Sequence, residues 1–240
     1  MKKVIPYILS FSLFAYLIIV LTFAETKLDE VYCKGIKVFV NEEENSFIDE
    51  ADVMQLFKRS VGELKDVPIA RIDKDSVERV LVKNSMIKSA QVYYRLDGYL
   101  YIKVKQRKPI LRVIAQKQFY VDEEGKMMPL SKKYTARVVV ATGNVSPSFA
   151  CEQLYPFVMN VKKNDFWDAM IEQIVVTQDN EVILIPKVGN FRIRLGDLEN
   201  VDQKMEKLFL FLREGIALKG WNKYKEINLE YRNQIVCVKK

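Results

Sequence analysis

The stretch Ala90–Val104, which reads AQVYYRLDGYLYIKV, decides the fold of the first half of the chain. Apolar residues occupy every second position on both sides of the Asp97-Gly98 pair. This period is that of a strand with one buried face, and Asp-Gly is typical of a tight hairpin turn. The stretch therefore predicts an antiparallel hairpin whose buried face carries Ala90, Val92, Tyr94, Leu100, Ile102 and Val104, and whose exposed face carries Tyr101, Lys103 and Lys105.

One strand and two helices are predicted ahead of this hairpin. Residues 31–40 alternate as a strand. Asp49 can cap a first amphipathic helix, and a second helix follows with Asp75 and Glu78 at the spacing of a capping box. The order strand–helix–helix–strand–strand predicts a compact α+β domain over residues 31–108, with two helices on one face of a three-stranded sheet.

A long apolar run precedes this domain. Val4–Ala24 contains twenty-one residues without Asp, Glu, Lys or Arg, and roughly 20 apolar residues suffice for a helix to span a bilayer. Two lysines lie before the run and mostly acidic residues after it, so the positive-inside rule leaves the N-terminus in the cytoplasm. We expect a cytoplasmic tail over residues 1–3, a transmembrane helix over 4–24 and a linker over 25–30.

A cleaved signal peptide is the alternative interpretation of this run. Lys2 and Lys3 would form its basic region, and the small residues at Thr22 and Ala24 suit a cleavage site. Apolar segments of signal peptides are usually about 7–15 residues long, which favours a retained anchor here. Both interpretations place the rest of the chain outside the cytoplasm.

The second half of the chain is rich in predicted strands. Pro109 fits a domain boundary, and apolar alternation continues beyond it. Strands are expected at 171–177, 182–186 and 191–195, followed by a long helix with Asn200 and Gln203 at N-cap and N3 spacing, and then by two terminal β-prone runs. Residues 109–240 are therefore predicted to form a mixed, mostly antiparallel β domain with a C-terminal helix and terminal strands.

The composition excludes several classes of function. The 38 basic and 31 acidic residues give a formal net charge of +7, but both signs are mixed along the chain and an exported domain meets no DNA, so no nucleic-acid partner is expected. The absence of histidine excludes Ser-His-Asp and Cys-His catalysis and the common histidine-containing zinc sites. Cys33, Cys151 and Cys237 form no CxxC pair, and whether two of them form a disulfide stays open.

The sequence offers no constellation for catalysis. Its paired carboxylates lie in predicted turns or helix starts, where acidic residues have local structural roles. These pairs are Glu42 with Glu44, Asp49 with Asp52, and Asp122 with Glu124. No nucleophile-elbow serine, glycine-rich phosphate loop or EF-hand spacing occurs. We therefore predict that the protein is not an enzyme and takes no cofactor, metal or small-molecule substrate.

A series of short sequence motifs carries a family resemblance. They are Phe47-Ile48, Ile72-Asp73, Val77-Glu78, 88–92, 98–104 and 106–110 in the first half, and 120–122, Gly125, 128–130 and 141–143 in the second. Taken together in this order, they resemble the bacterial cell-division family FtsQ (DivIB). The resemblance implies a POTRA-like domain over residues 31–108, a second, β domain over 109–240, and a single-pass inner-membrane protein located at the division septum.

The resemblance also implies a function. Members of this family are scaffolds without catalytic activity, which link early division proteins to the machinery of septal peptidoglycan synthesis. The implied direct partners are FtsB/DivIC-like and FtsL-like division proteins. The FtsW and FtsI synthases would be reached indirectly through them.

The terminal run is the candidate partner-binding site. It is β-prone and ends in two lysines, and a plain edge strand protected by charge is one interpretation of such a run. The family resemblance instead implies that this edge accepts a strand from an FtsB/DivIC-type partner by β-augmentation. The matching residues are Tyr231, Gln234, Ile235, Val236, Cys237, Val238 and Lys239. Glu230 stands where the family motif usually has arginine, so a salt bridge from that arginine is not expected here.

Two other classes of function remain as alternatives. POTRA domains also occur in components of outer-membrane protein assembly or secretion. Such a component would carry about eight or more alternating strands of about ten residues each, a series that the sequence after residue 109 does not show. The other class is an exported enzyme, and the sequence contains no catalytic motif that supports it.

Overall fold

The computed structural model describes residues 10–20, 31–41, 47–95, 97–216 and 220–240. The chain divides into two compact units, with the boundary between Gln106 and Arg107. Each unit has its own hydrophobic core. The two units are therefore considered one at a time.

The apolar run at the start of the chain is described only in its middle. Residues 10–20 are helical, whereas 4–9 and 21–24 lie outside the described residues, as do the predicted tail over 1–3 and linker over 25–30. Among the described residues, none of the helices combines the length and the apolar composition that crossing a membrane requires.

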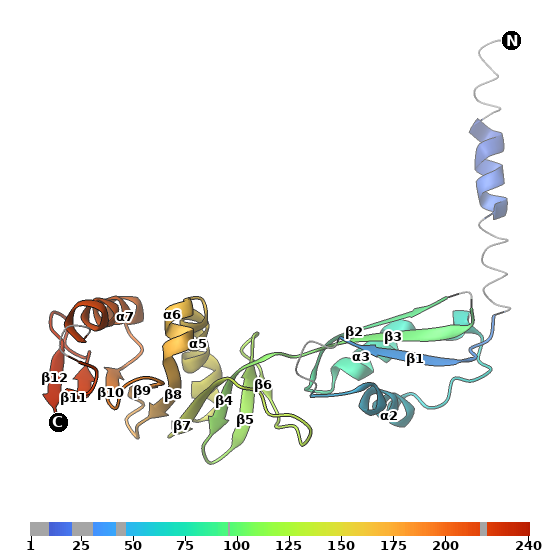
Figure 1. The fold of residues 1–240 in the computed structure, drawn as a ribbon. Helices are drawn as coiled ribbons and strands as arrows, with labels where there is room; N and C mark the ends of the chain where they lie inside the picture. Colours follow the sequence, from blue (N-terminus) through green and yellow to red (C-terminus); the bar gives the residue numbers. More distant parts are fainter. Residues whose placement is uncertain (1–9, 21–30, 42–46, 96, 217–219) are drawn as a thin grey trace, which may run out of the picture. The chain divides into compact units, whose positions relative to one another are not determined.

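The first unit contains a three-stranded sheet with β3 at its centre (Figure 1). Its strands are β1 (Gly35–Val40), β2 (Ile87–Tyr94) and β3 (Tyr99–Gln106). Strands β2 and β3 form the predicted antiparallel hairpin, and β1 pairs with the other side of β3 in parallel. The element order of the unit is the predicted strand–helix–helix–strand–strand.

Two α-helices lie against one side of this sheet, α2 (Glu50–Ser60) and α3 (Lys74–Val82), with a short 3-10 turn at Ile69–Arg71 before α3. The predicted N-cap of α2 is confirmed. The Asp49 side chain accepts from the Asp52 backbone N–H at 2.9 Å, and the Asp52 carboxylate accepts from the Asp49 N–H at 3.0 Å. This reciprocal pair is a capping box, which satisfies two of the amide donors that a helix start leaves unpaired.

The prediction for the start of α3 was wrong. Asp73, and not Asp75, is the N-cap residue, and its carboxylate accepts from the Ser76 N–H at 3.0 Å. Glu78 faces the sheet instead and accepts from the Val92 N–H of β2 at 2.6 Å. Asp73 and Asp75 are both acidic residues that could cap this helix. Because Glu78 contacts the sheet, it cannot complete a capping box with Asp75.

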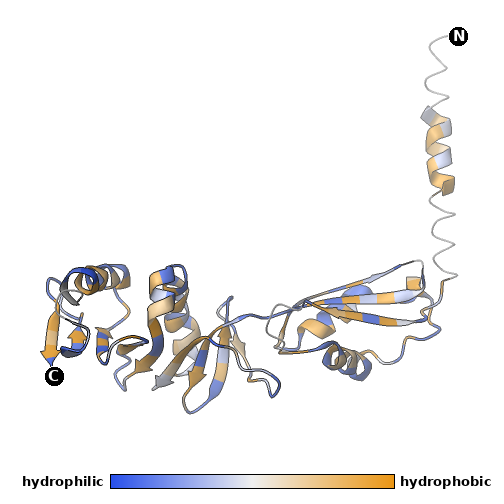
Figure 2. Ribbon diagram, in the orientation of Figure 1, coloured by the Kyte–Doolittle hydropathy of each residue, from blue (hydrophilic) through white to orange (hydrophobic). Residues whose placement is uncertain are grey.

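The core of the first unit lies between the helices and the inner face of the sheet. It includes Val53, Phe57, Val77 and Leu81 from the helices and Val38, Ala90, Val92, Leu100, Ile102 and Val104 from the strands. The alternation of apolar and polar residues along these strands is visible in Figure 2. The side chain of Gln106 is also buried, and its amide oxygen accepts from the Phe47 and Ile48 N–H groups at 2.8 and 3.2 Å.

One expectation about the outer face of this sheet was wrong. Lys103 and Lys105 are exposed as predicted, but Tyr101 is only 6% exposed. Its ring is stacked between Phe39 of β1 and Tyr93 of β2. Alternation predicts which face a residue occupies, but the residues on neighbouring strands decide how much of it remains exposed.

The second unit contains a nine-stranded sheet in the order β12-β11-β10-β9-β8-β7-β4-β5-β6 (Figure 1). The strands are β4 (Pro109–Ile114), β5 (Gln118–Asp122), β6 (Met127–Met128), β7 (Val139–Gly143), β8 (Ile171–Val176), β9 (Val182–Pro186), β10 (Arg192–Gly196), β11 (Tyr224–Asn228) and β12 (Val236–Lys239). The pairs β4–β7, β7–β8 and β10–β11 are parallel, and the other neighbours are antiparallel. The predicted mixed, mostly antiparallel sheet is therefore present.

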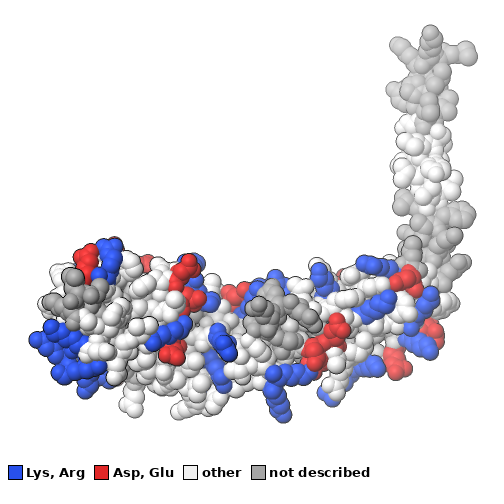
Figure 3. All heavy atoms as spheres, viewed as in Figure 1, with Lys and Arg blue, Asp and Glu red and all other residues white. Residues whose placement is uncertain are grey.

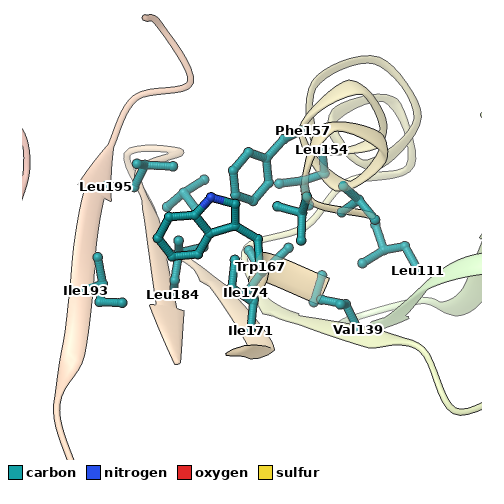
Figure 4. Packing of buried hydrophobic residues seen from close by; sticks show 14 of the residues in the cluster. Leu111, Val139, Leu154, Phe157, Trp167, Ile171, Ile174, Leu184, Ile193 and Leu195 are labelled. Atoms are coloured by element: carbon teal, nitrogen blue, oxygen red, sulfur yellow. The ribbon is translucent and has the colours of Figure 1, made fainter. Parts of the chain in front are cut away.

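Helices cover one face of this sheet. The segment before β8 contains α4 (Pro147–Phe149), a π-helical turn at Ala150–Leu154, α5 (Tyr155–Lys162) and α6 (Asp165–Met170). The long helix before β11 is α7 (Val201–Leu210), which continues as a π-helix over Phe211–Ile216. Trp167 of α6 packs into the core between these helices and the sheet, close to Leu184 and Phe157 (Figure 4).

The predicted N-cap position of α7 is confirmed at Asn200, although its side chain does not cap the helix. Asn200 precedes the helix, but its backbone is left-handed, with φ at +50°, and its side chain makes no capping hydrogen bond. Asparagine is one of the few residues that adopt this conformation readily, which explains its presence at this position. The helix itself is confirmed, and it buries Met205 and Leu208 against the sheet.

An ion pair lies at the start of the second unit. The Arg107 guanidinium donates to the Asp122 carboxylate at 2.6 Å, and the Asp122 side chain is only 1% exposed. The other Asp122 oxygen accepts from the Glu124 and Lys126 N–H groups at 2.9 and 2.8 Å. Asp122 thus fixes the turn after β5 to the residue that follows the unit boundary.

Candidate functional site

The terminal strand β12 lies at one edge of the nine-stranded sheet. It spans Val236–Lys239 and pairs antiparallel with β11, so Gln234 and Ile235 lie just before it and outside the strand. Val236 is 38% and Val238 48% exposed, and Lys239 is exposed as well. The edge therefore presents two β-branched side chains to solvent, next to the backbone of an outer strand.

A continuous apolar row crosses the sheet and ends at this strand. The strand registers align Phe119, Val113, Ala141, Ile174, Leu184, Ile193, Ile227 and Cys237 side by side on the helix-covered face. All of them are buried except Cys237, which is half-buried. Burial raises the pKa of the Cys237 thiol above its ordinary value. The hydrophobic core of the unit thus ends at Cys237. Among the described residues, no further strand pairs with β12 on its outer side.

The backbone direction along β12 follows from two hydrogen bonds. The Lys240 N–H donates to the Lys223 carbonyl at 3.2 Å, and the Leu229 N–H donates to the Arg194 carbonyl of β10 at 2.9 Å. Backbone groups of successive residues in a strand point to opposite sides. Both bonds therefore turn the N–H and C=O of Cys237 away from β11, toward the open edge. These are the groups that an added strand would pair with.

The loop between β11 and β12 carries Tyr231, whose side chain is 49% exposed. Helix α7 holds this loop, because the Lys207 ammonium donates to the Tyr231 and Arg232 carbonyls at 2.7 and 3.1 Å. Glu230, which occupies the position where the family motif has arginine, accepts a hydrogen bond from the side-chain amide of Asn228 at 2.7 Å. Its carboxylate is thus used within the loop.

A hollow of about 460 Å³ lies beside this loop, next to the first turns of α7. Its lining mixes both charge signs and includes Asp197, Glu206, Lys204, Lys207, Glu230 and Arg232, with Leu210 and Leu229 as apolar residues. Lys204 is engaged by Asp197 at 2.6 Å, and that contact is the main reason why the pKa of the Asp197 carboxyl lies below its usual value. The hollow is thus a polar surface adjoining Tyr231.

An ion network borders the edge on the face opposite the helices. Glu226 of β11 contacts Arg192 at 2.5 Å and Arg194 at 3.5 Å, and Arg194 also contacts Glu181 at 3.1 Å. Val238 lies directly beside Glu226 in the strand register. Sequence reasoning missed this network, because the parallel pairing of β10 with β11 brings together residues more than thirty positions apart.

The surroundings of the edge are basic. Lys223, Lys225, Lys239 and Lys240 are all exposed. Figure 3 shows lysine and arginine side chains gathered at the end of the unit where β11 and β12 lie, whereas elsewhere on the visible face both signs are mixed. The edge of the sheet at β11 and β12 is therefore positively charged.

The other candidate residues have local contacts. Asp49 and Asp52 form the capping box of α2, and Asp122 pairs with Arg107, whereas Glu42 and Glu44 lie outside the described residues. Cys33, Cys151 and Cys237 are free thiols. Within the part of the chain that the structure describes, no group of three or more acidic or cysteine residues is placed to hold a metal ion.

The element order defines an α+β protein whose first unit has a POTRA-like fold. Residues 31–105 match the family model of the POTRA-like domain. Residues 108–238, more than half of the chain, match the family model described as FtsQ/DivIB, C-terminal related. The chain therefore belongs to the FtsQ/DivIB family. No curated protein matches the chain. Membership of this family supports a division-related scaffold role.

Proposed function

We propose that this protein is a single-pass, non-enzymatic scaffold of the bacterial division complex. Residues 4–24 would anchor it in the inner membrane, with residues 1–3 in the cytoplasm and 25–30 as the linker. The domains over 31–108 and 109–240 would lie on the outer side, at the septum. The twenty-one apolar residues of the anchor and the family membership support this arrangement.

The proposed mechanism is strand addition at β12. A segment of an FtsB/DivIC-like protein would pair with the outward N–H and C=O groups of Cys237, and with those of Ile235 and Lys239, two positions away on either side. Main-chain hydrogen bonds would supply affinity, and side chains at alternate positions would supply selectivity. The observation that carries this proposal is the apolar row that ends half-buried at Cys237.

The row also determines which side chains the added strand needs. A partner residue beside Cys237 on the helix-covered face should be apolar, because it would continue the core past Ile227. A partner residue on the other face would contact Val236 and Val238, which are exposed. Acidic residues just outside the pairing segment would meet the surrounding lysines, which favours fast association.

Membrane anchoring makes a short interface sufficient. The four residues of β12 offer few main-chain pairs, and such a contact would be weak between molecules free in solution. Partners anchored in the same bilayer share a small volume, which raises their effective concentration and the avidity of the assembly. The FtsL-like partner, and through it the FtsW and FtsI synthases, would join the complex in this way.

The test uses a substitution that removes one outward donor and little else. Cys237→Pro removes the N–H that points to the open edge, and proline is tolerated at edge positions whose N–H faces solvent. Cys237→Val is the matched control, because it keeps the backbone donor and a small apolar side chain. The measurement is copurification of the FtsB/DivIC-like protein with the tagged full chain from the native host.

We expect the proline variant to lose about tenfold or more of the copurified partner, because each pairing position on a short strand carries a large share of the contact. The valine variant should retain normal recovery. Equal recovery with both variants would contradict strand addition at β12. In that case the interface would lie elsewhere on the second unit.

A further inference from the structure

The outer face of the three-stranded sheet in the first unit combines aromatic rings with cations. Helices α2 and α3 pack on the opposite face. Phe39 and Tyr93 remain 47% and 36% exposed although they belong to a sheet. We call this surface the aromatic–basic face, and define it by Lys37, Phe39, Tyr93, Arg95, Lys103 and Lys105, which are all exposed.

The rings on this face form a rigid stack across all three strands. Tyr101 at the centre stacks on Phe39 with centroids 6.1 Å apart and on Tyr93 with centroids 5.3 Å apart, and the planes differ by only 2° and 12°. The three rings are therefore nearly parallel and follow one another across the sheet.

Two cations are held against this stack. The Lys37 ammonium lies 4.1 Å from the Tyr99 ring centroid, and the Arg95 guanidinium lies 4.7 Å from that of Tyr101. Asp97 is the acidic residue at this site, and it accepts from the Tyr101 hydroxyl at 2.7 Å. Four cations thus face one carboxylate, which leaves the aromatic–basic face positively charged.

The chain enters the unit next to the hairpin turn that carries Asp97. The Lys34 N–H donates to the Gly98 carbonyl at 2.7 Å, and the Lys34 ammonium donates to the Asp97 carbonyl at 3.1 Å. The hairpin turn that carries Asp97 is therefore close to the start of the unit. Only residues 25–30 separate the expected anchor from the unit, and six residues reach at most about 20 Å.

We propose that the aromatic–basic face docks on the anionic phospholipid headgroups of the bilayer that holds the anchor. The inference rests on the proposed membrane anchor and goes beyond the proposed partner binding. Aromatic rings prefer the headgroup level of a bilayer, and each basic residue near an anionic surface raises the attraction about fivefold. A docked first unit would have a fixed orientation on the membrane instead of turning freely on its linker.

The test compares lysines on two faces of one domain in the full chain. The chain is reconstituted in nanodiscs of phosphatidylcholine alone, or of phosphatidylcholine with about a third phosphatidylglycerol. An amine-reactive reagent then labels exposed lysines, and mass spectrometry gives the rate for each. Lys103 and Lys105 report on the aromatic–basic face, and Lys58 on α2 with Lys83 after α3 are the internal controls, since all four are exposed.

We expect phosphatidylglycerol to lower the labelling rates of Lys103 and Lys105 about fivefold relative to Lys58 and Lys83. Salt near 1 M should restore the rates, because screening then shortens electrostatic attraction to about 3 Å. Equal rates in the two nanodiscs would overturn the inference. Protection that is the same without phosphatidylglycerol would also overturn it, and would assign the face to another occupant.

A charge-removal pair provides an independent test. Lys103→Gln with Lys105→Gln should abolish the lipid-dependent protection of Lys37, whereas Lys58→Gln with Lys83→Gln should leave it unchanged. Protection that survives the first pair would overturn the inference. Recovery of the chain in the nanodisc fraction is measured separately. A chain that does not enter nanodiscs of either composition would refute both the anchor and this inference. An inserted chain with unprotected lysines would refute only the docking.

Discussion

Removal of the Asp122 carboxylate should destabilise the second unit strongly. Its side chain is 1% exposed and accepts three hydrogen bonds, one from Arg107 at 2.6 Å and two from backbone N–H groups. Breaking a buried ion pair by removing one partner costs about 3–5 kcal/mol. Glu124 lies 3.9 Å from the same guanidinium and offsets part of this loss. We therefore expect Asp122→Ala to lower the free energy of unfolding by about 3 kcal/mol.

Asp122→Asn separates the two parts of this effect. It keeps an oxygen for the two backbone donors and removes the charge that faces Arg107, so we expect about half of the alanine effect. Asp179, which is exposed in the turn between β8 and β9, provides the matched control, and Asp179→Ala should change stability by less than about 0.5 kcal/mol.

The assay is urea unfolding of the full chain in detergent, followed by tryptophan fluorescence. Trp167 and Trp221 are the two tryptophans of the chain, and both belong to the second unit, so the signal reports on that unit. With a slope of about 2–3 kcal/mol per molar urea, Asp122→Ala should lower the midpoint by roughly 1 M. A midpoint equal to that of Asp179→Ala would refute the reasoning.

Two further predictions concern a carboxylate and a glycine. The hydrogen bond from the Tyr101 hydroxyl, more than that from the Tyr99 N–H, lowers the pKa of the Asp97 carboxyl in the folded protein. The stabilisation that this carboxylate contributes is therefore present above the ordinary carboxyl pKa, and it is lost as pH falls through the lowered pKa. Asp97→Asn should therefore flatten the acid dependence of hydrogen exchange in β2 and β3, and an unchanged dependence would contradict this. Gly143→Ala should destabilise the second unit by several kcal/mol, since φ is +90° and the new Cβ would meet the Val176 carbonyl oxygen at 2.2 Å. Gly220→Ala, with the same φ and open space around it, should cost only about 1 kcal/mol in the same urea assay, and equal effects would refute the steric argument.

Local patterns in the sequence predicted the elements well. The hairpin of β2 and β3 was predictable because strict alternation and an Asp-Gly turn are both local signals. The N-cap at Asp49 was predictable for the same reason, whereas its reciprocal bond with Asp52 was seen only in the structure. The cap of α3 was not, because Glu78 is engaged by Val92, a residue of another element.

Contacts between distant strands were not predictable. The burial of Tyr101 depends on Phe39 from β1, which pairs in parallel with β3 although two helices and β2 lie between them along the chain. The ion network around Glu226 depends on the parallel pairing of β10 with β11. The sequence indicated that the terminal run is a strand, but the apolar row that ends at Cys237 required the register of the whole sheet. The partner-binding role of this edge stays a prediction.

The most direct test of the central claim is localisation of the full chain in its native host, with a fluorescent tag on the N-terminus. A second chain that ends at Asn233 lacks β12 but retains β11. We predict a midcell band for the full chain during division, and loss of the FtsB/DivIC-like protein from midcell when only the shortened chain is present. Uniform envelope fluorescence of the full chain throughout the cell cycle would contradict the division role. Normal partner recruitment by the shortened chain would contradict the role of β12.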